Sequence, residues 1–159
     1  MQTNLYQITP DDQPALAEIG ALLRAGGLAG IPTETVYGLA ANALDGQAVA
    51  KIFQAKGRPQ DNPLIVHIAA FSQLYPLVSE VPTQAIRLAR AYWPGPLTMI
   101  LPKSPAIPEE VSAGLETVAV RMPSHPLARA IIRAAGVPLA APSANLSGSP
   151  SPTTAQHVL

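Results

Sequence analysis

The stretch KIFQAKGRPQDNPLIVHI, residues 51–68, passes from a helical pattern through a loop into an apolar strand. Its first part completes a helix that we predict from Asp45, a capping residue, to Lys56. Glycine and two prolines in residues 57–63 break both helical and strand periods, and residues 64–68 then form a short apolar run typical of a buried strand. A helix that leads into a strand is the alternation expected of an α/β sheet. The buried side of the helix should consist of Ala48, Val49, Ile52 and Phe53.

The same alternation extends in both directions from this stretch. A first helix should begin at residues 11–14 and close at Gly26-Gly27, with Leu16, Ile19, Leu22 and Leu23 at helical spacing. Further helices are predicted over 82–92, with Ile86, Leu88 and Ala89 inward, over 126–135, and from Pro152 onward. Further strands are predicted over 28–31, 97–101, 117–122 and 137–141. Because some connections are too short for a helical crossover, we expect a mixed sheet.

Composition excludes several classes of protein. The 159 residues include no cysteine, which excludes disulfides and thiolate catalysis, and the three histidines lack metal-binding spacing. Ten basic residues balance ten acidic ones, so no broad field attracts nucleic acid. No apolar stretch reaches the roughly 18 residues of a membrane span, and residues 1–12 do not resemble a signal peptide, so we expect no membrane contact and a cytoplasmic location.

The length suits one domain, residues 1–159. The chain stops inside the helical pattern that starts at Pro152. We therefore expect a single domain that is truncated at its C-terminus, with no second domain.

Two cations follow the helix that ends at Lys56. Lys56 and Arg58 flank Gly57, which permits close approach of a ligand to the backbone. The lysine ammonium is a compact charge and the arginine guanidinium is a planar group with several donors, and the two together suit a polyphosphate. They are equally typical of solvated cations at a helix C-terminus, so this pair alone leaves both readings open.

Other polar residues lie at the ends of apolar strands, where ligands bind in open α/β sheets. Arg121 shares a strand face with Thr117 and Ala119 if the valines between them face the core. It could hold a carboxylate, or it could lie on an exposed face. His67 could be a ligand or a satisfied core histidine, and the polar loop 143–145 could bind phosphate or form an ordinary turn.

Six stretches, in this order along the chain, resemble the YrdC-like threonylcarbamoyl-AMP synthase family. They are PTETVYGL (32–39), KIFQAKGRP (51–59), NPLIVH (62–67), WPGPLT (93–98), VAVRMP (118–123) and APSAN (141–145). The resemblance implies an α/β fold with a twisted open mixed sheet, flanking helices and a large concave ligand cleft. It also implies that residues 1–159 form the catalytic domain, although family members usually continue past this point with further strands and a Gly-Ser/Thr-rich segment.

The resemblance further implies a nucleotidyltransferase that makes threonylcarbamoyl-AMP and pyrophosphate from ATP, L-threonine and bicarbonate, with Mg²⁺ accompanying ATP and no metal ligand from the protein. This product serves threonylcarbamoyladenosine modification of tRNA through a downstream threonylcarbamoyl-transferase complex, and tRNA itself is a possible partner. By the same match, the catalytic tetrad is Lys56, Arg58, Ser143 and Asn145. ATP-binding residues would be Lys56, Arg58, Asn62, Thr117, Ser143 and Ser151. Threonine-binding residues would be Thr35, His67, Arg121 and the backbone of Ala141.

Two other functions remain as alternatives. A non-catalytic module that binds double-stranded RNA or tRNA could keep the concave fold, although a full tetrad and zero net charge disfavour it. A carbamoyl-transfer domain of the hydrogenase-maturation type shares the fold, but such domains normally lie in longer chains with zinc-finger-like cysteines.

Overall fold

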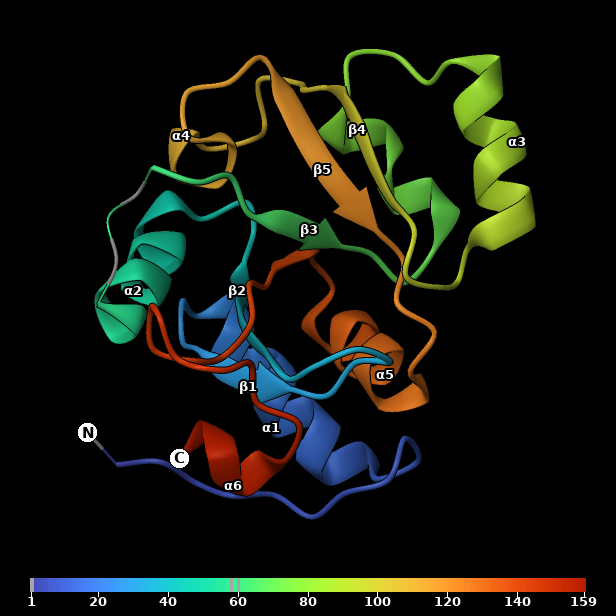
Figure 1. Ribbon diagram of the computed structural model, residues 1–159. Coiled ribbons are helices and arrows are strands. Elements are labelled where there is room, and N and C mark those ends of the chain that lie inside the picture. The colour runs from blue at the N-terminus through green and yellow to red at the C-terminus, as the bar shows by residue number, and fades with distance from the viewer. Residues whose placement is uncertain (1, 58, 60) are drawn as a thin grey trace.

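The computed structural model describes residues 2–57, 59 and 61–159. Its centre is one six-stranded sheet in the order β1-β2-β6-β3-β5-β4 (Figure 1). The strands are β1 (Ala29–Ile31), β2 (Gly38–Asn42), β3 (Ile65–His67), β4 (Thr98–Pro102), β5 (Thr117–Arg121) and β6 (Leu139–Ala140). Only β3 and β5 are parallel, and the other neighbouring strands run antiparallel. The predicted mixed sheet is confirmed.

The longer helices begin and end at local signals in the sequence. They are α1 (Gln13–Arg24), α2 (Gly46–Lys56), α3 (Thr83–Tyr92) and α5 (Pro126–Ala135). Asp12 and Asp45 accept hydrogen bonds from the first turns of α1 and α2, which satisfies backbone donors that have no partner within the helix. Gly57 ends α2 in the left-handed conformation, with φ 63°, which glycine adopts without steric cost. Shorter helical segments are η1 (Phe71–Gln73), η2 (Tyr75–Leu77), α4 (Glu109–Ser112) and α6 (Ala155–Val158).

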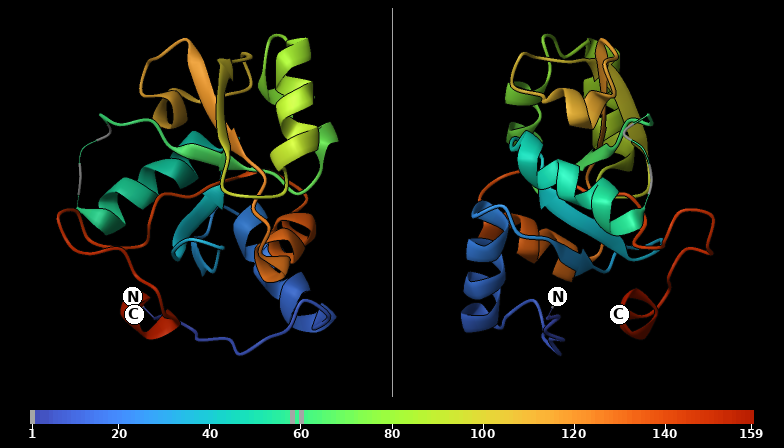
Figure 2. Two further views of the ribbon diagram at one scale, coloured as in Figure 1. Left: turned by 45° about the vertical axis from the view of Figure 1, so that its right-hand side comes forward. Right: turned by 90° about the vertical axis from the view of Figure 1, so that its left-hand side faces the viewer.

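Helices cover both faces of the sheet around β2 and β6. Successive strand residues point to opposite faces, so Ala40 packs with α1 and α5 while Ala41 packs with α2. Figure 2 shows α1 and α5 together, apart from α2. The first two helices touch closely, because a Cβ on Gly20 of α1 would lie 2.4 Å from the carbonyl oxygen of Ala134 in α5.

At the other end of the sheet, strands β5 and β4 are covered on one face only. Val66, Val118 and Val120 join the core beneath α3 and α4. The alternate residues of β5 are only partly buried, and Ile100 of β4 is 69% exposed on the same side as Arg121. This arrangement confirms the predicted alternation of β5 and leaves an open face for polar side chains.

Three features differ from the sequence predictions. Strand β2 was not predicted, because Gly38–Asn42 contains none of the β-branched or aromatic residues that are typical of strands. Leu88 of α3 and Leu22 of α1 are exposed, although helical spacing placed both with inward residues. On α3, only Ala85 and Ala89 are buried, and Ile86, which was also predicted to face inward, is partly buried.

Among the described residues, no helix combines the length and the apolar character needed to cross a membrane. The N-terminal segment and α6 both lie at the foot of the molecule (Figure 1).

Candidate functional site

Lys56, the last residue of α2, contacts the loop that follows β6 through both its side chain and its backbone. Its side chain is buried, with 4% of the residue exposed. The ammonium Nζ donates to the carbonyl oxygens of Ser143 and Asn145, the latter at 2.7 Å. Its own carbonyl oxygen accepts from the backbone N–H of Ser147 at 3.1 Å. Lys56 therefore fixes the loop that follows β6 against the end of α2. Figure 1 shows this orange-red loop beside α2.

A polar pocket of about 360 Å³ opens between this loop and the segment after α2. One polar atom in the pocket lining is buried without a partner: Oδ1 of Asn145 accepts no hydrogen bond from any described residue. The amide nitrogen of Asn145 is occupied, since it donates to the carbonyls of Leu146 and Ser149. The pocket thus offers cationic, amide and hydroxyl groups to a polar ligand. Its polar lining residues are Lys56, Asp61, Asn62, Ser143, Asn145 and Ser147.

The structure brings together three of the residues predicted to bind ATP, namely Lys56, Asn62 and Ser143, and places Asn145 of the predicted catalytic tetrad beside them. Thr117 lies at the start of β5, at the opposite end of that strand from Arg121, and does not line the pocket. Ser151 is exposed in the loop before α6, and it does not line the pocket either. Arg58 lies outside the described residues. The roles predicted for all of these residues stay predictions.

A second group of polar side chains lies on the open face, where the parallel strands β3 and β5 end. His67 and Arg121 are register partners on these strands. The guanidinium of Arg121 donates through Nε and Nη2 to the hydroxyl of Thr98 on β4, at 3.0 and 2.8 Å. This contact leaves the remaining donors of the guanidinium for another acceptor.

His67 is neutral at physiological pH. Burial, followed by the positive charge of Arg121, lowers the pKa of His67 to about 4, although nearby backbone carbonyls and Glu34 oppose this effect. Its Nδ1 lies 3.1 Å from the carbonyl oxygen of Ile65, which can only accept, so we assign the ring proton to Nδ1. The other ring nitrogen then has an acceptor lone pair.

Sequence reasoning missed Glu34. It lies in the loop between β1 and β2, and its Oε2 accepts from the backbone N–H of Ser124 at 3.0 Å. Its Oε1 is buried and has no hydrogen-bond partner among the described residues. The available signal was a carboxylate between two threonines in the stretch PTETVYGL, of which only Thr35 was selected.

Thr35 and Ala141 belong to segments that connect the polar pocket with the group of side chains at the ends of β3 and β5. Thr35 is exposed, and its hydroxyl lies 3.0 Å from that of Thr33 in the same loop. Ala141 is buried, and its backbone N–H donates to Ile65 of β3. The residues that follow Ala141 run on to the polar pocket, so both groups belong to one continuous region.

Backbone hydrogen bonds hold this region together. Leu39 N–H donates to the carbonyl of Pro142 at 2.8 Å, and Ala144 N–H donates to the carbonyl of Tyr37 at 2.9 Å. The loop that carries Glu34 and Thr35 is thereby tied to the loop that carries Ser143.

A larger, mainly apolar pocket of about 630 Å³ lies elsewhere, between the N-terminal segment, α1 and α6. None of the residues predicted to bind a substrate lines it.

Known proteins resemble this chain closely. The threonylcarbamoyl-AMP synthase of Pyrococcus abyssi (strain GE5 / Orsay) is 60% identical over 136 residues, which are 86% of this chain and 40% of that protein. The threonylcarbamoyl-AMP synthase of Bacillus subtilis (strain 168) is 60% identical over 148 residues, 92% of this chain and 43% of that protein. The crystal structure of P. abyssi Sua5 complexed with L-threonine matches with a TM-score of 0.90 and 54% identity, over 96% of this chain and 44% of that one.

The chain thus spans less than half the length of these relatives. The Sua5/YciO/YrdC family model, whose description is telomere recombination, matches residues 21–159. With this match, the resemblance seen in the six sequence stretches is confirmed: the chain belongs to the Sua5/YciO/YrdC family.

Proposed function

We propose that this chain is an L-threonylcarbamoyladenylate synthase, a nucleotidyltransferase that joins ATP, L-threonine and bicarbonate into threonylcarbamoyl-AMP and releases pyrophosphate. The observation that carries the proposal is the continuity of the region described above. Segment 141–145 runs from β3, where His67 lies, to the polar pocket beside Lys56. The names of the relatives, and the L-threonine bound to one of them, point to the same reaction.

In this proposal the polar pocket holds the phosphates of ATP. Ser143 and Asn62 offer neutral hydrogen-bonding groups, and Lys56 with Arg58 supplies positive charge. Thr117 and Ser151 are proposed to contact the rest of the nucleotide. Transfer of a nucleotidyl group needs positioning and charge neutralisation more than a covalent nucleophile, and the absence of cysteine agrees with direct transfer.

The group on the open face is proposed to hold L-threonine. Arg121 would take the carboxylate, because a guanidinium forms strong paired hydrogen bonds with it. The neutral imidazole of His67 and the hydroxyl of Thr35 would orient the rest of the molecule, with the backbone of Ala141 beside them. The neutral amine then attacks the carbon of bicarbonate, which gives a carbamate with loss of water, and the carbamate oxygen attacks the α-phosphorus of ATP as pyrophosphate leaves.

We propose that Mg²⁺ enters with ATP. No cluster of three or more His, Asp or Glu side chains suited to a metal occurs among the described residues, so the phosphates would supply most of its ligands. The pocket nevertheless fits such a hard cation, because Asp61 and the unpartnered Oδ1 of Asn145 are oxygen donors. When bound, Mg²⁺ would neutralise phosphate charge.

The product would pass to a threonylcarbamoyl-transferase complex that modifies tRNA, and the proposed location of the reaction is the cytoplasm. The balance of ten basic and ten acidic residues gives no general attraction for RNA, so any contact with tRNA would be local.

The proposal is tested by measuring pyrophosphate release from ATP. We expect release only when L-threonine and bicarbonate are both present, and omission of either should reduce it to background. Release that ignores threonine would contradict the assignment, and release supported by carbamoyl phosphate in their place would identify a carbamoyl-transfer domain. Absence of any nucleotide binding would favour the RNA-binding alternative.

A further inference from the structure

Two opposite charges near His67 are not paired with each other. Among the described residues, the one ion pair joins Lys103 to Glu109, remote from this region. Arg121 therefore contacts a neutral hydroxyl, on Thr98, and Glu34 contacts a neutral backbone N–H, on Ser124. A half-buried carboxylate without a counter-ion is costly, and its presence calls for a partner.

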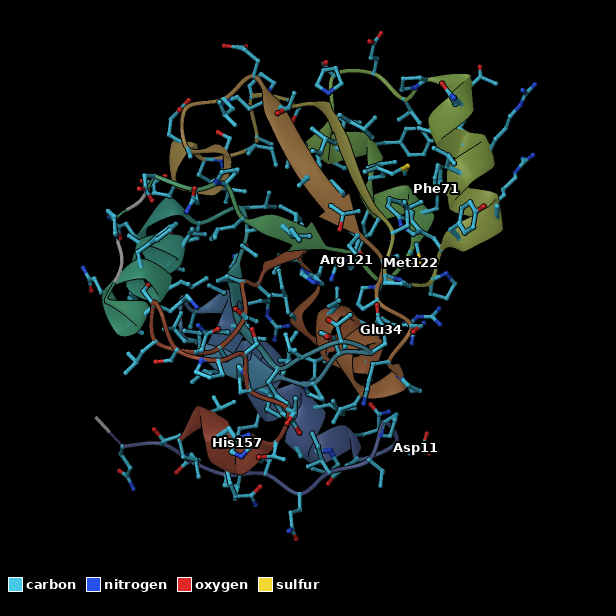
Figure 3. All side chains as sticks on the ribbon, viewed as in Figure 1. Asp11, Glu34, Phe71, Arg121, Met122 and His157 are labelled. Carbon is cyan, nitrogen blue, oxygen red and sulfur yellow. The ribbon has the colours of Figure 1, made fainter. Side chains whose placement is uncertain are left out.

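The two charges lie at the same edge of the sheet. Ser124, which holds Glu34, comes three residues after Arg121 and just beyond β5. Figure 3 shows Glu34 near the end of β5, where Arg121 and Met122 lie. Both charges also act on the pKa of the buried His67, which Arg121 lowers and Glu34 raises.

An α-amino acid zwitterion is complementary to this arrangement, because it carries one carboxylate and one ammonium group. We propose that Glu34 binds the amino group of the amino-acid substrate through Oε1, while Arg121 receives its carboxylate. This inference rests on the proposed function and adds to it a residue that selects for the amino group.

The chemistry explains why Oε1 is left unpartnered. The backbone N–H of Ser124 fixes Oε2, so the carboxylate is oriented before the substrate arrives. Oε1 can accept a hydrogen bond from the ammonium and also from the neutral amine that reacts. A nitrogen that donates to Glu34 directs its lone pair elsewhere, which leaves that lone pair available to form the carbamate bond.

Calorimetry with two ligands tests this role. L-Threonine and 3-hydroxybutanoate share a carboxylate and a hydroxyl, but 3-hydroxybutanoate lacks the amino group. We expect Glu34→Gln to weaken threonine binding about ten- to a hundredfold, because a charge-assisted hydrogen bond is lost. Its affinity for 3-hydroxybutanoate should equal that of the wild type. Glu80→Gln, which removes an exposed carboxylate between η2 and α3, is the matched control and should bind threonine normally.

The fold should survive, since the glutamine carbonyl can still accept from Ser124, and the thermal unfolding midpoint checks this. If Glu34→Gln does not fold, Glu34→Asp provides the same comparison with the charge withdrawn by one methylene group. Unchanged threonine affinity, or an equal loss for both ligands, overturns the role of Glu34 while leaving the proposed function intact. A wild-type chain that binds no threonine overturns both.

Discussion

The polar pocket and the open face handle charge in different ways. At the pocket, the ammonium of Lys56 is occupied by the backbone carbonyls of Ser143 and Asn145. On the open face, Arg121 and Glu34 each contact one neutral group and no opposite charge among the described residues. The ammonium of Lys56 holds the backbone of the pocket in place, whereas the side chains of Arg121 and Glu34 can pair with charges on a ligand. Lys56 and Arg121, which sequence analysis assigned to phosphate and to a carboxylate, therefore also differ in how their charges are held.

The largest effect should come from removing the charge of Lys56. In Lys56→Met, two carbonyls in the loop after β6 lose their donor, and each such loss costs roughly 1–3 kcal/mol. We expect the free energy of unfolding in urea to fall by about 4 kcal/mol, because both losses add. Lys51→Met is the control: the exposed Lys51 donates to one carbonyl, that of Gly26, and should cost about 1 kcal/mol. An equal loss of unfolding free energy in both variants would contradict the structural role of Lys56.

The next effect concerns the neutral imidazole between Arg121 and Glu34. Because burial and Arg121 lower the pKa of His67 from 6.5 to about 4, the unfolded chain binds a proton that the folded chain does not between these values. The stabilising contribution is therefore fully present above pH 6.5 and is lost as the pH falls toward 4. Its size is on the order of 3 kcal/mol.

Urea unfolding of the wild type and of His67→Gln across pH 7.5 to 4 checks this expectation. The wild type should lose more stability than the variant over that window, since glutamine does not titrate. Parallel curves would mean that His67 is accessible to protons in the folded chain, and the open face would then lose its neutral acceptor.

Local signals explain which elements the sequence predicts well. Helix α2 was predicted correctly at both ends, because Asp45 caps its first turn and Gly57 takes the left-handed conformation. Helix α5 likewise ends at Gly136, with φ 69°. Strand β2 has no such signal, since small residues become a strand only through their pairing with β1 and β6.

For the candidate site, the sequence indicated residue types but not the contacts between them. The motifs selected Lys56, His67 and Arg121, and the alternation of β5 placed Arg121 on the correct face. The acceptors of Lys56, however, lie 87 and 89 residues further along the chain, and no local pattern encodes that pairing. Glu34 was overlooked for the same reason, because its contact with Ser124 spans 90 residues.

A third prediction tests whether the open face and the polar pocket bind different ligands. Arg121→Ala should weaken L-threonine binding about ten- to a hundredfold, because a paired charge-assisted contact with the carboxylate is lost. Binding of a non-hydrolysable ATP analogue should stay as in the wild type. Titration calorimetry with each ligand measures both, and Arg87→Ala on the exposed side of α3 is the control. Comparable losses for both ligands would place Arg121 outside the threonine site.

The smallest expected effect distinguishes residues of the polar pocket that stabilise the fold from residues that only bind the nucleotide. Asn145 donates to the carbonyls of Leu146 and Ser149 in exposed contacts, and these carbonyls can bind water instead, so Asn145→Ala should lower the free energy of unfolding by only about 1 kcal/mol. Asn62 lines the same pocket and makes no hydrogen bond to the described residues, so Asn62→Ala should change stability by less than about 0.5 kcal/mol. Both variants should nevertheless weaken binding of the ATP analogue, because each removes an amide that faces the pocket. If only Asn145→Ala weakens it, the loop after β6 supplies the nucleotide contacts, and Asn62 merely borders the pocket.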